Sequence, residues 1–253
     1  MFRTRIIPVL LLTHSDLVKS TKFKNYHYIG DALNAVKIFN DLEADELAFL
    51  DIQATKEGRT IDLDVVQKIG EEANMPFSVG GGITTVEQIR ALTKAGAERV
   101  IIGTNAALNP NFIKEASDSF GSSTISVCID VKKNLWGKEY IWTNNGKEQH
   151  KIEPLDFALQ MQEKGAGEII IQSMEKDGMM QGFDAALIKK ITEAVTIPVV
   201  ALGGAGNMAH FKELYNQCPT SGIASGSTFV YQGSMKGVLI NYPSTQEKKN
   251  IYE

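Results

Sequence analysis

The chain has 253 residues and a formal net charge of −4. The acidic balance argues against a nucleic-acid-binding surface, and the length allows one large core. The first apolar run, Ile6 to Leu12, is too short for a membrane span or a signal peptide. The cysteines, Cys128 and Cys218, have no ligand spacing, and the histidines are scattered. We therefore expect a cytoplasmic protein with no metal, no cofactor and no membrane partner.

Short apolar segments alternate with amphipathic ones along the chain. Strands are predicted at 5–12, 46–51, 76–80, 98–102, 123–131, 168–172, 197–202 and 221–225. Helices are predicted near 30–42, 61–73, 84–95, 109–119, 154–164, 184–194 and 208–217. The strands are apolar throughout, which is typical of a parallel sheet buried on both faces. This alternation predicts an α/β protein, a single-domain (β/α)₈ TIM barrel, with a flavodoxin-like open sheet as the structural alternative.

Three segments depart from the alternation. Residues 13–29 are predicted to form a long polar loop after the first strand, a candidate for a mobile lid. Residues 133–150 contain an Asn-Gly pair between strand-like runs, which predicts a small hairpin. The barrel is expected to span 1–241, and 242–253 to form a polar, loosely ordered tail. The segment from Gly233 to Ile240 is short and interrupted by glycine, so the last barrel helix is expected to be stunted or missing.

The two halves of the chain repeat each other. The segment Phe77-Ser-Val-Gly-Gly-Gly82 corresponds to Val200-Ala-Leu-Gly-Gly-Ala-Gly206, and each runs through a helix into a second glycine. Those second glycines stand in Gly103-Thr104 and Gly226-Ser227. The repeat predicts two half-barrels, and the barrel topology places all four loops on one face.

Glycine-rich loops on one barrel face are suited to phosphate. Without a Cβ, backbone N–H groups can approach phosphate oxygens closely. Two such clusters facing each other across the mouth predict a ligand with a phosphate at each end. The plain alternative is that the glycines only form tight turns.

Carboxylates also end the predicted strands. Asp51 and Asp130 close two of them, and Asp177 follows a third, which is a position typical of catalytic groups or of helix caps. In the repeat, Asp130 corresponds to Leu11. A reaction that needs two opposed acid–base groups would therefore lack one here.

Charged residues begin four strands at the opposite end of the barrel. They are Arg5, Glu46, Arg99 and Glu168. From the residues alone, a stabilising ring of salt bridges is the favoured interpretation. The alternative is a gate for a small molecule that enters the barrel from below.

Several segments together resemble one known family, the cyclase subunit of imidazole glycerol phosphate synthase. The matching stretches are 5–8, 44–52, 79–83, 129–132, 165–169, 177–178 and 203–206. The resemblance implies a (β/α)₈ barrel docked on a glutaminase partner. It further implies that ammonia enters at the bottom, travels along the axis and attacks a doubly phosphorylated ribulosyl substrate at the top. The four charged strand-start residues match that family's gate, with arginine in place of the usual lysine at position 99.

The resemblance also implies roles for individual residues. Asp130 matches the second catalytic aspartate, whereas the first one is replaced by Leu11. Expected phosphate-binding residues, from the match and the glycine pattern together, are Lys19, Gly82, Thr104, Asp177, Gly178, Gly204, Gly226 and Ser227. Gly103 stands where the family has asparagine, and Ser20 and Leu202 are further departures.

These departures resemble a branch of the family found with surface-polysaccharide enzymes. They lead to a first hypothesis: a barrel subunit of a glutamine-dependent amidotransferase that passes ammonia to a third protein, which amidates an N-acetyl sugar. The alternative is a genuine imidazole glycerol phosphate synthase cyclase subunit of histidine biosynthesis. A related sugar-phosphate isomerase and a purely structural binding protein are weaker options.

Overall fold

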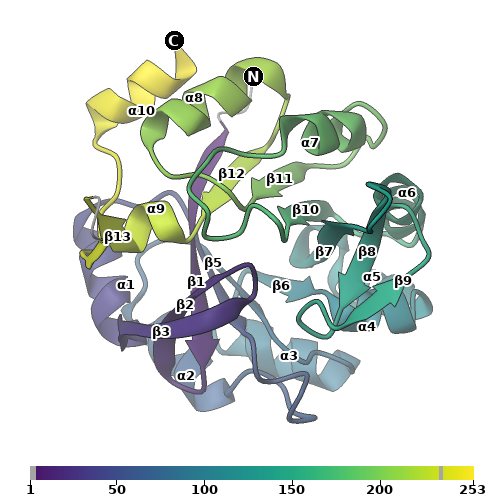
Figure 1. Ribbon diagram of the computed structural model, residues 1–253. Coiled ribbons are helices and arrows are strands. Elements are labelled where there is room, and N and C mark those ends of the chain that lie inside the picture. Colours follow the sequence, from purple (N-terminus) through teal and green to yellow (C-terminus); the bar gives the residue numbers. More distant parts are fainter. Residues whose placement is uncertain (1–3, 234–235) are drawn as a thin grey trace.

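The structure is a computed structural model that describes residues 4–233 and 236–253. In the described chain, eight parallel strands close into a barrel, because β10 pairs with β7 as well as with β11 (Figure 1). The barrel strands are β1 (Arg5–Thr13), β4 (Leu47–Asp51), β5 (Phe77–Gly80), β6 (Arg99–Ile102), β7 (Ile125–Lys133), β10 (Glu168–Ser173), β11 (Val199–Leu202) and β12 (Gly222–Ser225). The predicted single-domain (β/α)₈ barrel is confirmed, and the open sheet is excluded.

The predicted helices also form, and they surround the barrel. They are α1 (Ala32–Asp41), α2 (Leu63–Glu72), α3 (Val86–Lys94), α5 (Asn111–Phe120), α6 (Pro154–Glu163), α7 (Ala185–Thr192) and α8 (Met208–Gln217). Several begin at side-chain caps, for example Thr85, which forms a capping box with Gln88 ahead of α3. Two short helices, α4 (Thr104–Leu108) and α9 (Ser227–Val230), and a 3₁₀ turn (Ser122–Thr124) complete the connections.

Alternation along the strands divides the apolar residues into two cores. On β1, Ile6, Leu10 and Leu12 point outward to the helices. Ile7 and Val9 belong to a smaller cluster inside the barrel, together with Leu11. Because side chains alternate with a period of two, Arg5 and Leu11 lie on the same inward-facing side of β1, one at each end. The inner cluster therefore connects the two ends of the barrel.

The segment after β1 is a hairpin, so the prediction of a loop over 13–29 is wrong. β2 (Asp16–Thr21) pairs with the end of β1, and β3 (Lys24–Asp31) pairs with β2. The two turn residues, Lys22 and Phe23, both have positive φ. Glycine or asparagine usually occupies such positions, so the turn carries no sequence signal.

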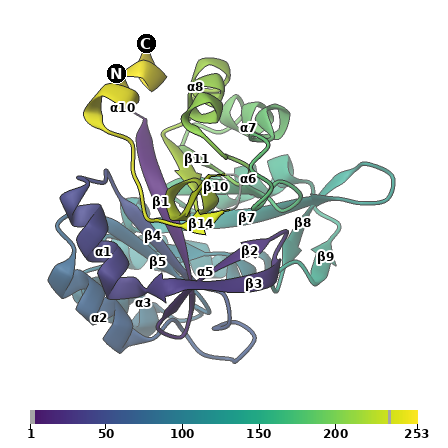
Figure 2. The ribbon, with the colours of Figure 1, turned by 60° about the vertical axis from the view of Figure 1, so that its left-hand side comes forward.

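The hairpin predicted within 133–150 is confirmed. β8 (Glu139–Thr143) pairs with β7, and β9 (Glu148–His150) pairs with β8. The β7–β8 hairpin projects away from the barrel (Figure 2). The Asn144-Asn145-Gly146 segment adopts positive φ at all three residues and leads from β8 into β9.

The C-terminal segment ends in a helix, which corrects the expectation of a loosely ordered tail over 242–253, whereas the described part of 233–240 forms no helix, as expected. β13 (Tyr231–Gln232) and β14 (Gly237–Val238) form a small ribbon, and α10 (Thr245–Tyr252) packs beside α8 (Figure 1). The buried Tyr242 hydroxyl donates to the carbonyl of Ile6 at 2.9 Å and accepts from the N–H of Asp45 at 3.0 Å. These contacts tie the C-terminal segment to the bottom of the barrel. Within the described residues, every helix is too short or too polar to cross a membrane.

Candidate functional site

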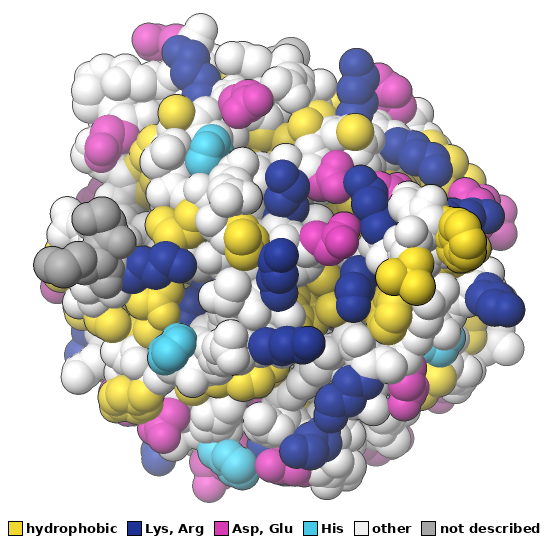
Figure 3. Space-filling model, in the orientation of Figure 1, with side chains coloured by type: hydrophobic (Ala, Val, Ile, Leu, Met, Phe, Trp, Pro, Cys, Tyr) yellow, Lys and Arg dark blue, Asp and Glu magenta, His cyan; other side chains and the backbone are white. Residues whose placement is uncertain are grey.

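A pocket of about 280 Å³ opens at the carboxyl ends of the strands. We call it the mouth. The charged residues that line it, among those described, are Asp51, Arg59 and Asp130. Lysine and arginine side chains lie across the middle of the molecular face that carries the β2–β3 hairpin (Figure 3). This distribution of charge favours an anionic ligand.

Asp130 lies on the inward face of β7, at the mouth. Its pKa is raised from 3.8 to about 7. Burial is the main cause, the charge of Asp177 adds to it, and a weak hydrogen bond from the Cys128 thiol opposes it. A carboxyl group that titrates near neutral pH can both donate and accept a proton, as general acid–base catalysis requires.

Leu11 faces Asp130 from the other side of the barrel. β1 and β7 are opposite strands, with β4, β5 and β6 between them on one side. Leu11 is 9% exposed and packs in the inner apolar cluster. Asp51, the other carboxylate that lines the mouth, is already paired with Arg59 at 2.6 Å. Asp130 therefore has no unpaired carboxylate opposite it among the described lining residues.

Asp51 serves the local structure. Its Oδ1 accepts hydrogen bonds from the N–H groups of Gln53 and Ala54, and its Oδ2 binds Arg59. The side chain is fully shielded from solvent. The alternative from the sequence was a cap on the next helix, but α2 begins at its own cap, Asp62, and Asp51 instead caps the turn that follows β4.

The expected phosphate-binding positions come together at the mouth end, but the two halves differ. Gly82 and Thr104 line the open pocket. Gly82 has φ +64, and a Cβ there would collide with the carbonyl of Arg59. Only glycine fits such a position without displacing the backbone.

The second half of the expected phosphate site is packed against the chain itself. Lys19 is 5% exposed, and its Nζ lies 3.8 Å from Asp177 and against Gly226, where a Cβ would be 2.6 Å away. Gly178 packs on the backbone at Ser20, and Gly204 on that of Gly182. Ser227 is buried as well. The β2–β3 hairpin thus covers this half.

Asp177 holds the hairpin in place. Its carboxylate accepts hydrogen bonds from the Ser20 hydroxyl at 3.0 Å and the Phe23 N–H at 3.4 Å. Its carbonyl accepts from the N–H of Lys22. The residue at position 20 therefore contributes directly to the closed position of the hairpin.

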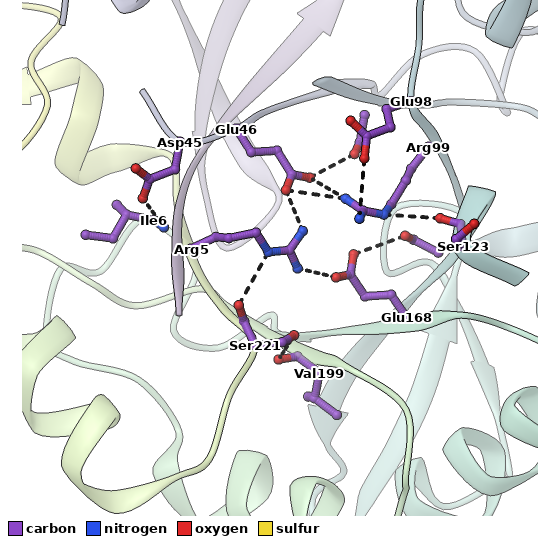
Figure 4. A network of polar contacts seen from close by, with 12 residues as sticks. Arg5, Ile6, Asp45, Glu46, Glu98, Arg99, Ser123, Glu168, Val199 and Ser221 are labelled. Carbon is purple, nitrogen blue, oxygen red and sulfur yellow. Dashed lines mark hydrogen bonds and ion pairs between the residues drawn. The ribbon is translucent and has the colours of Figure 1, made fainter. Parts of the chain in front are cut away.

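The four charged strand-start residues meet in a ring at the bottom of the barrel (Figure 4). Arg5 binds Glu46 at 2.5 Å and also Glu168, and Arg99 reaches Glu46 at 3.4 Å. Ser78 and Ser126 donate to the remaining carboxylate oxygens at 3.0 and 3.1 Å. The ring predicted from the sequence therefore forms.

The bottom ring is largely removed from water. Burial raises the pKa of Glu46, and Arg5 opposes that shift. The pKa of Arg5 is raised, because the attraction of Glu168 and Glu46 outweighs its burial. Charges with these partners stabilise one another, whereas a single one left alone would be costly.

A small cavity of about 10 Å³ lies on the barrel axis between the bottom ring and the mouth. Glu46, Ser78 and Glu168 line its lower part, and the other lining residues are apolar or carry a thiol. Its volume is about the room that one water-sized molecule needs. The side chains of the described residues therefore pack the barrel interior apart from this small space.

The lining residues of the mouth that were not selected from the sequence include Arg59, Cys128, Asn145 and Gln172. Asn145 donates to the carbonyl of Ile52 at 2.6 Å, so the β8–β9 turn reaches over the mouth. Cys128 and Gln172 lie on the inward faces of β7 and β10 and line the mouth. Cys128 is two residues before Asp130, and this spacing was the signal that could have identified it.

Comparison with known proteins gives a consistent result. A family model described as "Histidine biosynthesis protein" matches residues 5–236. The chain is 43% identical over 254 residues to the "Putative imidazole glycerol phosphate synthase subunit hisF3" of Vibrio vulnificus, covering 100% of this chain and 98% of that one. It is 42% identical over 253 residues to a "Putative imidazole glycerol phosphate synthase subunit HisF" of Leptospira interrogans, covering both chains completely.

A third relative is the "Imidazole glycerol phosphate synthase subunit HisF" of Pyrococcus furiosus, 41% identical over 232 residues and covering 91% of each chain. These names support the histidine-pathway alternative better than the polysaccharide hypothesis. The chain belongs to the histidine biosynthesis protein family, among relatives named as HisF-type imidazole glycerol phosphate synthase subunits.

Proposed function

We propose that this chain is the ammonia-receiving barrel subunit of a glutamine-dependent enzyme of the imidazole glycerol phosphate synthase type. One observation carries the proposal: the bottom ring, the axial cavity and the mouth lie in line through the barrel. The names of the relatives support the reaction type.

The proposal assigns the bottom ring to nitrogen entry. A glutaminase subunit would dock at this end, and Arg5, Glu46, Arg99 and Glu168 would form the gate. An apolar axis transmits neutral ammonia far more readily than ammonium, because an unpaired charge is costly to desolvate. The axial cavity matches the size of that molecule.

The mouth is assigned to the acceptor. Gly82 and Thr104 would hold one phosphate of the ligand at the open side. A second site would form once the β2–β3 hairpin shifts enough to open space between Lys19, which lies on β2, and Asp177, Gly178, Gly204, Gly226 and Ser227. Asp130 would act as the acid–base group, since its pKa is about 7.

A second candidate function rests on Leu11. With an isobutyl group facing Asp130, the mouth has one proton-transfer group where a two-group mechanism needs two. In this candidate, ammonia leaves the mouth unreacted and a sugar amidotransferase uses it to amidate an N-acetyl sugar of a surface polysaccharide.

A single assay separates the two candidates. The purified chain is given the doubly phosphorylated ribulosyl substrate and ammonium salt, and imidazole glycerol phosphate is measured. If the synthase function holds, the wild type forms product. If only Leu11→Asp forms product, the second candidate is favoured, because the scaffold is intact and lacks one acid–base group. Ile52→Asp, which adds a carboxylate elsewhere in the same mouth, is the matched control and should add no activity.

A further inference from the structure

Three side chains separate the axial cavity from the mouth. Leu50, Ile101 and Cys128 line both spaces. They come from β4, β6 and β7, on the half of the barrel that carries the open part of the mouth. Because the two spaces share these three lining residues, a direct passage from the axial cavity to the mouth would run past them.

A glycine in the intervening strand brings two of these side chains together. Gly80 of β5 pairs with Leu50 on one side and Ile101 on the other. A Cβ at Gly80 would lie 2.8 Å from Cδ2 of Leu50 and 3.0 Å from Cβ of Ile101. The two side chains therefore occupy the space above Gly80, and substitution of the glycine would force them apart.

Cys128 supplies the third wall and the first polar atom on the mouth side. Its Sγ lies 3.8 Å from Oδ1 of Asp130 and 4.0 Å from Oε1 of Gln172. Burial raises the pKa of this thiol well above 9, and the charge of Asp130 adds to the shift. The group is thus a neutral, weakly polar donor at neutral pH.

We propose that Leu50, Ile101 and Cys128 form an inner constriction of the barrel, and that Cys128 is the residue that controls passage of neutral ammonia from the axial cavity to Asp130 and Gln172. This inference rests on the ammonia-conducting function proposed above.

The surroundings account for selectivity as well as passage. Below the constriction, the hydroxyl of Ser78 and the carboxylates of the bottom ring can bind the entering molecule. At the constriction, the two aliphatic side chains and the neutral thiol themselves offer an ammonium ion no charged partner, so the ion would have to leave the carboxylates below before it reaches Asp130. Above it, the oxygens of Asp130 and Gln172 accept hydrogen bonds. Ammonia therefore moves between two polar stations across one apolar barrier.

The test compares two nitrogen sources in the complex of this chain with a glutaminase subunit. Product is measured with glutamine and, separately, with ammonium salt, in wild type, Cys128→Phe and Cys128→Ser. The bulky variant is expected to lower the ratio of glutamine-driven to ammonium-driven rate at least about tenfold. More glutamine is then hydrolysed per product formed. Cys128→Ser, which keeps a small donor, should leave the ratio within about twofold of wild type.

A second measurement avoids any folding defect of the bulky variant. Methyl methanethiosulfonate can reach Cys128 from the mouth, and at alkaline pH, where more thiolate is present, it converts the thiol of the folded complex into a methyl disulfide and releases methanesulfinate. Mass spectrometry of the intact chain confirms the modification before the rates are measured. The ratio should fall on modification and recover with a reducing agent, and Cys128→Ala should not respond. The other cysteine, Cys218, is buried and lies outside both cavities. Cys218→Ala is therefore the matched control, and its ratio should respond to the reagent as that of the wild type does.

The outcomes are distinct. Equal loss of both rates would show that Cys128 acts only within the mouth and would overturn the constriction. The constriction would also be overturned if the ratio of glutamine-driven to ammonium-driven rate stayed unchanged in Cys128→Phe and after chemical modification of Cys128. If wild type forms product from neither nitrogen source, the proposed function itself fails, and this inference falls with it.

Discussion

Asp130→Asn is expected to lower the rate of product formation at pH 7 by about a hundredfold or more, because it removes the one unpaired carboxyl group among the described residues lining the mouth. The rate of the wild type should change with pH around the Asp130 pKa of about 7. The pH profile of kcat is the measurement. Asp156→Asn, an exposed position on α6, is the control and should leave the profile unchanged. A pH-independent rate in the wild type would contradict the role of Asp130.

The same substitution should change the pH dependence of stability. In the unfolded chain Asp130 ionises near 3.8, whereas in the folded protein its pKa is about 7. The folded state therefore holds a proton that the unfolded state has lost, and stability falls as the pH rises from about 4 to about 7. Each unit of difference between the folded and unfolded pKa corresponds to about 1.4 kcal/mol, so the free energy of unfolding falls by at most about 4 kcal/mol. Asp130→Asn should be more stable than wild type at pH 8 and similar to it at pH 4.

Glu46→Ala is expected to lower the free energy of unfolding by about 3 kcal/mol. Glu46 is 3% exposed and binds both Arg5 and Arg99. Its removal leaves a net positive charge in a poorly hydrated ring and leaves the Ser78 hydroxyl without its acceptor. Both arginines keep some solvent contact, so the effect belongs at the lower end of the range for buried ion pairs. Urea denaturation at neutral pH measures it.

An exposed ion pair provides the comparison for that experiment. Lys114 and Asp118 are 2.8 Å apart on the surface of α5. Asp118→Ala should cost no more than about 0.5 kcal/mol. If Glu46→Ala costs as little as this control, the bottom ring is not an energetically coupled unit.

The barrel could be predicted from the sequence because its strands are short apolar runs at regular spacing, as at 168–172 and 197–202. The α10 helix could have been found too. Ser244 and Glu247 form a capping box, which is visible as a Ser-x-x-Glu pattern. The helix itself is polar. Its packing is shown only by tertiary contacts, those of Ile251 within the helix and of Tyr242 just before it.

The β2–β3 hairpin was beyond local reasoning. Its turn uses Lys22 and Phe23 in a conformation that favours glycine, and β3 is mostly exposed. Its stability comes instead from contacts distant in sequence, above all those with Asp177. Such contacts leave no pattern in the segment itself.

The candidate site was predictable at its two ends and not between them. Strand-end carboxylates and strand-start charges identified Asp130 and the bottom ring, since barrel topology fixes where strand ends lie. One glycine cluster is open and the other is covered, because Lys19 of the β2–β3 hairpin packs against Gly226. The repeated sequence pattern gives no sign of this contact. The proposed constriction likewise depends on Leu50 and Ile101 meeting beside Gly80 and on Cys128 of β7 joining them.

The central claim, that nitrogen travels from the bottom ring along the axis to the mouth, has one direct test. The complex with a glutaminase subunit is given glutamine labelled with ¹⁵N at the amide, together with an excess of unlabelled ammonium salt, and the nitrogen incorporated into product is analysed by mass spectrometry. Conduction through the barrel predicts product that carries mainly ¹⁵N. Product labelled only in proportion to the mixed ammonia pool would show that nitrogen arrives from solvent, and would contradict the account.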